Sequence, residues 1–95
     1  MTAGSVTLLV PGALRSETDG ASRLELPARP TLAGVLDELG SRWPRLERRL
    51  RDERGELRRY VNVYVDGEDC RLSGGLGATV APGAEVQVIP SVAGG

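Results

Sequence analysis

The residues whose chemistry stands out are the last two, Gly94 and Gly95, which close the stretch SVAGG. Without a Cβ, a glycine pair can thread a narrow channel and adopt backbone angles that are closed to other residues. The α-carboxyl group of Gly95, with an ordinary pKa near ~3.5, is an anion at neutral pH and a poor electrophile. It becomes an acyl donor only after an activating group is attached, and ATP is the usual source. The pair therefore indicates that the C-terminal carboxyl group is itself the working part.

The rest of the sequence lacks the side chains on which most enzymes depend. It contains no His and no Lys, so it has no histidine base, no Ser-His or Cys-His nucleophile, no Schiff base and no phosphate-loop lysine. The stretch GGLGAT is only superficially a phosphate loop, because it lacks the terminal Lys and opens no convincing helix. The sequence therefore predicts no catalytic residue, no metal site and no bound cofactor. A second, activating protein would have to bind the ATP.

The composition is that of one small globular domain. The chain has 95 residues, of which 40% are hydrophobic and 26% charged, and its formal net charge is −1. A charge so close to zero creates no field that would attract nucleic acid or an anionic membrane. No signal-peptide pattern and no run long enough to span a bilayer is evident. The single cysteine, Cys70, excludes an internal disulfide and is expected to be a small, half-buried hydrophobe. These features predict a cytoplasmic protein.

Hydrophobic periodicity predicts strands at both ends of the chain and a helix between them. A change to apolar residues at i, i+3, i+4 and i+7 from residue 32 predicts an amphipathic helix with Thr31 as its N-cap and Gly40 as its stop. The apolar stripe continues beyond an interruption at Pro44. Period-two alternation predicts strands over 6–10, 24–26, 61–65, 68–72 and around Val86 and Val88.

This order, two strands, a helix and three further strands, predicts an α+β domain. We expect a mixed sheet of four to five strands with one main helix packed across it. Residues 1–90 would form this domain, and residues 91–95 a flexible tail that ends in Gly-Gly. The alternative for the last two residues is a frayed end or an expression remnant.

The order is that of the β-grasp, or ubiquitin-like, fold, in which the first and last strands lie parallel at the centre of the sheet. From Tyr60 onward, the sequence YVNVYVDGEDCRLSGGLGATVAPGAEVQVIPSVAGG resembles the ubiquitin-like sulfur carriers of the MoaD/ThiS family. The VN strand, the aspartate and arginine that follow it, the strand ending in VIP and the final VAGG are most similar to the CysO-like carriers of cysteine biosynthesis.

The resemblance implies a reaction cycle at Gly95. An E1-like enzyme of the MoeB/ThiF type would adenylate its carboxylate with ATP, and a rhodanese-type protein or sulfide would supply the sulfur of a thiocarboxylate. A PLP-dependent cysteine synthase, or another synthase, would accept that sulfur, and a metalloprotease would then process the C-terminus. Val92, Ala93 and Gly94, which precede Gly95 in the chain, would thread with it into the active site of each partner.

A docking surface for these partners is expected beside the tail. On the strand over 61–65 the valines should face the helix, so that Tyr64 faces outward. Pro90, at the root of the tail, would border the same surface. Arg58 and Arg59, in the preceding loop, could steer the protein toward an acidic groove on the activating enzyme.

Other functions use the same fold. The chain could be a β-grasp interaction module, a ubiquitin-like protein modifier or the small subunit of molybdopterin synthase. The sequence also leaves open which product receives the sulfur: cysteine, thiamin, molybdopterin, a thiolated tRNA or a thiosugar. A fold alone does not determine the product.

Overall fold

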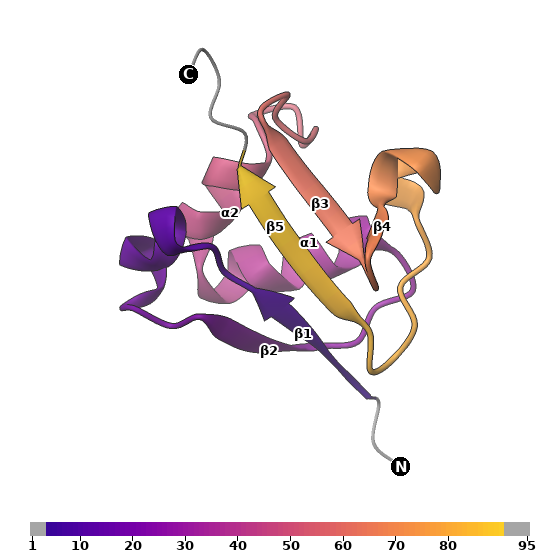
Figure 1. The fold of residues 1–95 in the computed structure, drawn as a ribbon, viewed down its shortest axis with the longest axis horizontal. Helices are drawn as coiled ribbons and strands as arrows, with labels where there is room; N and C mark the ends of the chain where they lie inside the picture. Colours follow the sequence, from indigo (N-terminus) through magenta and orange to yellow (C-terminus); the bar gives the residue numbers. More distant parts are fainter. Residues whose placement is uncertain (1–3, 91–95) are drawn as a thin grey trace.

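The computed structural model describes residues 4–90. Its strands form one mixed sheet in the order β2-β1-β5-β3-β4 (Figure 1). The strands β1 and β5 are parallel and central, and every other neighbouring pair is antiparallel. The strand bounds are Ser5–Leu9 for β1, Arg23–Pro27 for β2, Val61–Val65 for β3, Glu68–Asp69 for β4 and Glu85–Pro90 for β5. The predicted α+β fold and its β-grasp strand order are confirmed.

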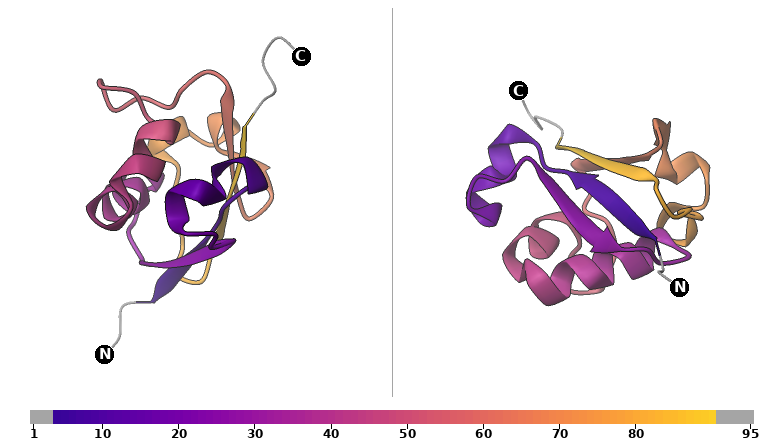
Figure 2. Two further views of the ribbon diagram at one scale, coloured as in Figure 1. Left: turned by 90° about the vertical axis from the view of Figure 1, so that its left-hand side faces the viewer. Right: turned by 90° about the horizontal axis from the view of Figure 1, so that it is seen from below.

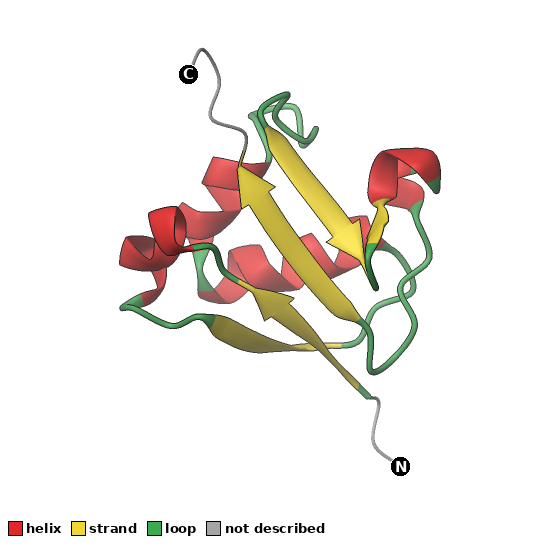
Figure 3. Ribbon diagram, viewed as in Figure 1, coloured by secondary structure: helices red, strands yellow, loops and turns green. Residues whose placement is uncertain are grey.

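Two α-helices cover one face of the sheet and leave the other face open (Figures 2 and 3). They are α1 (Leu32–Arg42) and α2 (Pro44–Leu50). The strand residues that point toward the helices are at most 2% exposed: Val6, Leu8, Val61, Val63, Val86 and Val88. The predicted stripe of α1 packs against them and is fully buried: Leu32, Val35, Leu36 and Leu39. Burial of these apolar side chains is the main force that holds the helices on the sheet.

The start of α1 is the predicted one, but its end is not. The Thr31 side chain accepts a hydrogen bond from the Gly34 N–H at 3.3 Å, as an N-cap should. Gly40 was predicted to stop the helix, and this prediction is wrong. The helix continues to Arg42. A Cβ on Gly40 would lie only 3.3 Å from a side-chain carbon of Glu47 in α2. The glycine therefore serves the close approach of the two helices.

The break between the helices comes from Pro44. The residue before a proline is disfavoured in the α region, and Trp43 has φ −131° and ψ 67°. Pro44 then begins α2, where its missing N–H costs no helical hydrogen bond. No helix within residues 4–90 is both long enough and apolar enough to cross a membrane.

Two segments differ from the expected strand and loop. The predicted strand over 68–72 is wrong: β4 has only two residues, and Cys70–Leu72 form a 3-10 helix, η2. The Asp69 carboxylate accepts a hydrogen bond from the Arg71 N–H at 3.0 Å, and this local bond favours a turn over a ladder. The segment between β1 and β2, for which the sequence predicts no strand or helix, contains the 3-10 helix η1 (Gly12–Thr18).

Candidate functional site

The expected reactive end follows directly on β5, one of the two central strands. Pro90, the last described residue, pairs with Val61 at the start of β3. The last described strand is therefore the central one of the sheet. The residues with the predicted chemical role, Val92, Ala93, Gly94 and Gly95, lie outside the described residues, and their roles stay predictions.

An apolar group lies on the open face of the sheet near the end of β5. In register, Gln87 of β5 has Leu9 of β1 on one side and Tyr64 of β3 on the other. Side chains alternate along a strand, so these three residues share the face opposite the buried valines. Ile89, two residues further along β5, is 41% exposed on the same face. Leu9, Tyr64 and Ile89 therefore form a partly exposed apolar patch near the end of β5, which we call the open-face patch.

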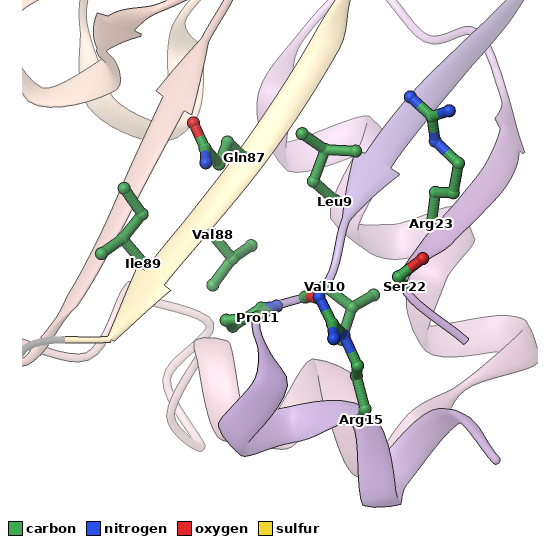
Figure 4. Close-up of a pocket in the computed structure, with 9 residues that line it drawn as sticks. All are labelled: Leu9, Val10, Pro11, Arg15, Ser22, Arg23, Gln87, Val88 and Ile89. Carbon is green, nitrogen blue, oxygen red and sulfur yellow. The ribbon is translucent and has the colours of Figure 1, made fainter. Parts of the chain in front are cut away.

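A groove borders this patch where β1 and β5 separate. It is open, has a volume of about 400 Å³ and is lined by Leu9, Val10, Pro11, Arg15, Ser22, Arg23, Gln87, Val88 and Ile89 (Figure 4). The parallel ladder ends at the pair Leu9 and Gln87, and Pro11 has no N–H with which to extend it. Arg15 Nε donates to the Val10 carbonyl at 3.0 Å. One edge of the groove is therefore cationic and the other apolar.

The predicted docking residues do not all meet on one surface. Tyr64 faces outward as expected and is half-buried. Pro90 was expected beside it, but its partner Val61 is buried and it has the parity of Val86 and Val88, so it belongs to the helix side of the sheet. Ile89 takes the place that was expected for Pro90.

The two predicted arginines lie in the loop before β3 and differ from each other. Arg58 is half-buried, and its Nε donates to the Arg48 carbonyl near the C-terminus of α2 at 2.9 Å. Arg59 is exposed. Of the pair, Arg59 is therefore the better placed to meet a partner, and Arg58 mainly completes the end of the helix.

Sequence reasoning missed Leu9, Ile89 and Arg15 as surface residues near the exit. The parity of β5 could have found Ile89, because Val86 and Val88 already defined the buried face. Nothing in the sequence could place Arg15 beside β5, since their proximity depends on the parallel pairing of two strands far apart in the chain.

The thiol of Cys70 is not accessible at the surface of the domain. Cys70 is fully buried, which corrects the half-buried position expected for it. Burial raises the pKa of its thiol, and the neighbouring Asp69 carboxylate raises it further. A thiol that is both buried and protonated is a poor nucleophile. Within residues 4–90, no group of three His, Cys, Asp or Glu side chains could hold a metal ion.

The fold and the exit of the chain from its central strand define a ubiquitin-like β-grasp domain. The model of the ThiS family matches residues 8–95, and the chain belongs to this family.

Sulfur carriers and a protein modifier are among the proteins that it resembles over most of its length. The sulfur carrier protein CysO of Mycobacterium tuberculosis is 39% identical over 93 residues, which are 96% of this chain and 99% of the relative. A chain in the crystal structure of the Amycolatopsis orientalis BexX/CysO complex is 40% identical, with a TM-score of 0.86 and coverage of 95% of this chain and 99% of that one. Small archaeal modifier protein 1 of Haloferax volcanii is 34% identical over 77% of this chain and 79% of its own length.

Proposed function

We propose that this protein is a sulfur carrier whose working group is the carboxylate of Gly95. An E1-like enzyme of the MoeB/ThiF type adenylates this carboxylate with ATP and releases pyrophosphate. Sulfide can displace AMP directly and leave a C-terminal thiocarboxylate. The persulfide of a rhodanese-type protein would instead displace AMP to give an acyl disulfide, from which a thiol releases the thiocarboxylate by forming a disulfide with the donor cysteine. The thiocarboxylate donates its sulfur to a biosynthetic acceptor.

One observation carries the proposal: the match to the ThiS family runs to residue 95 and so includes the Gly-Gly end. The identity of 39% with a sulfur carrier named CysO, over 96% of the chain, supports the same role. The fold supports it as well, because the residues before the Gly-Gly pair follow directly on a central strand. A tail of five residues could reach at most about 18 Å from that strand.

We further propose that the acceptor is a PLP-dependent cysteine synthase or a synthase of a thiosugar-type pathway, and that a metalloprotease restores the carrier after cysteine formation. The similarity to CysO supports the first acceptor. The similarity to a chain of the BexX/CysO complex supports the general point that such carriers work bound to a second protein.

Intact-mass spectrometry tests the proposal. The carrier is incubated with a competent E1-like enzyme, ATP and sulfide. We expect a mass increase equal to the exchange of one oxygen for sulfur, confined to the C-terminal peptide. Two matched variants, one lacking Gly95 and one with a residue added after it, should keep the circular dichroism spectrum of the wild type and stay unmodified. An unchanged wild-type mass, or modification of either variant, contradicts the proposal.

A second candidate function is that of a protein modifier, joined through Gly95 to amino groups of other proteins. The 34% identity to small archaeal modifier protein 1 favours it. The absence of Lys means that this chain cannot form chains with itself through lysine isopeptide bonds. A conjugate with a target lysine after incubation with the activating enzyme, in place of a thiocarboxylate, would support this function.

A further inference from the structure

Asp69 and Arg71, which follow β3 in the family-like stretch of the sequence, take no part in the proposed chemistry of Gly95. The structure gives them a shared position beside β3. The Asp69 carboxylate accepts a hydrogen bond from the Arg71 N–H at 3.0 Å and caps the 3-10 helix η2. Arg71 lies in the middle of this short helix, next to the first residues of β3.

The guanidinium of Arg71 donates three hydrogen bonds, and all three acceptors lie in one short segment. Its NH1 donates to Asn62 Oδ1 at 3.1 Å, and its NH2 to the Val61 carbonyl at 2.8 Å and to the Arg58 carbonyl at 3.3 Å. Each of these acceptors is a neutral group: two are backbone carbonyls and one is an amide oxygen. Hydrogen bonds from a cation to such groups are stronger than those between neutral groups.

These bonds compensate for the shortness of β4. That strand pairs with Tyr64 and Val65 alone, so within residues 4–90 no strand lies beside the first residues of β3 on their outer side. Backbone carbonyls at such an edge need another donor. Arginine supplies several N–H groups in one planar fork, which suits it to bridge acceptors that a single ammonium could not reach together.

The bridged segment also holds the end of β5. Val61 pairs with Pro90, the last described residue. The N–H of Val61 donates to the Arg58 carbonyl at 3.1 Å. The Arg58 N–H in turn donates to the Leu50 carbonyl at the end of α2 at 2.9 Å. Residues 58–62 therefore connect α2, the first residues of β3 and the end of β5. The Arg71 side chain bridges three residues of this segment by hydrogen bonds.

We propose that Arg71 is a positioning residue, which holds the segment 58–62 against the end of β5 and so fixes the surface that the activating enzyme meets beside the tail. The effect on activation rests on the proposed function, whereas the effect on the segment does not. Arg71 is itself exposed, so its removal leaves no cavity in the core.

The experiment compares Arg71→Ala and Arg71→Lys with Arg29→Ala. Arg29 is the control, because its guanidinium also donates hydrogen bonds, two of them to Glu38, yet it lies at the opposite end of the sheet beside Gly4 and Pro82. The first readout is amide hydrogen exchange at Val61. The second is the KM and kcat for the carrier in adenylation by the E1-like enzyme.

We expect exchange at Val61 to be about tenfold faster in Arg71→Ala, and the KM to rise about tenfold, because a charged bridge is lost. The kcat should change little, since the reacting carboxylate is the same once bound. Lysine can satisfy only part of the bridge, so Arg71→Lys should give intermediate values. Arg29→Ala should match the wild type in both readouts.

The outcomes separate the two proposals. If wild-type carrier is not adenylated by a competent enzyme, the proposed function fails, and unchanged Val61 exchange in Arg71→Ala would then overturn the bridge as well. If exchange quickens but the KM of Arg71→Ala equals that of Arg29→Ala, the positioning role is overturned. Should Arg71→Ala fail to fold, Arg71→Lys carries the same comparison.

Discussion

At the scale of single residues, the open face of β1 and β2 holds a carboxylate between two hydroxyl groups. Thr7 Oγ1 donates to Glu25 at 2.8 Å, and Ser5 Oγ donates to its other oxygen at 3.0 Å. These bonds, that from Thr7 first, lower the pKa of Glu25 below its ordinary value of 4.5. A hydroxyl that donates to a carboxylate favours the ionised form.

This arrangement predicts the direction of a pH effect. The folded protein prefers the ionised form of Glu25, so the stabilisation is complete above pH 4.5 and is lost as the pH falls through the lower, folded-state pKa. We expect Glu25→Gln to lower the free energy of unfolding at neutral pH and to have less effect in acid. Urea unfolding from about pH 6 to pH 3 measures the difference. A gap between variant and wild type that widens toward acid would contradict the argument, and Glu53→Gln controls for the loss of a surface charge.

At the scale of elements, the central strands and α1 could be predicted because their apolar residues repeat with the period of the element. The end of α1 could not be predicted, since glycine often follows the end of a helix, whereas Gly40 lies inside α1 where α2 packs closely on it. Nor could the length of β4, because the bond from the Arg71 N–H to Asp69 decides it locally.

The candidate site could be predicted only in part, for a physical reason. The Gly-Gly end and the outward Tyr64 follow from residue type and parity. The open-face patch depends on register between β1, β5 and β3, which are distant in sequence, and so Leu9 and Ile89 could not be grouped beforehand. Arg15 reaches the groove because it lies on η1. The hydrophobic residues of η1 show no clear period, so this helix could not be predicted from the sequence.

The open-face patch leads to a prediction about docking. Ile89 is 41% exposed beside the exit of the chain, whereas Leu72, on η2, is 80% exposed and lies off the patch. If the activating enzyme covers the patch, Ile89→Ser should raise the KM for the carrier in adenylation by about tenfold, because the variant buries less apolar area against the enzyme. Leu72→Ser is the matched control and should leave the KM unchanged. Equal KM values for the two variants would show that docking does not use this patch.

At the scale of the whole molecule, a net charge of −1 conceals two ends of opposite character. Where β5 begins, the exposed acidic residues Asp66, Glu68 and Glu85 gather, and Asp66 Oδ1 accepts from the Glu85 N–H at 2.9 Å. Where β5 ends lie α2 and the loop before β3 (Figure 1), and over residues 44–60 seven arginines outnumber four acidic residues. The basic end is the one from which the chain leaves the sheet toward Gly95.

Such polarity should orient the carrier as it approaches an acidic groove, which affects the rate of association more than the final affinity. We expect Arg59→Gln to lower the association rate constant with the E1-like enzyme by about twofold or more at low salt. Arg29→Gln, which removes the same charge at the other end, should have little effect. Stopped-flow measurements at two salt concentrations test this, because near 1 M salt the screening length falls to about 3 Å and the variants should converge. A loss that persists in high salt would mean that Arg59 acts through a direct contact, and equal losses in both variants would mean that the position of the charge is irrelevant.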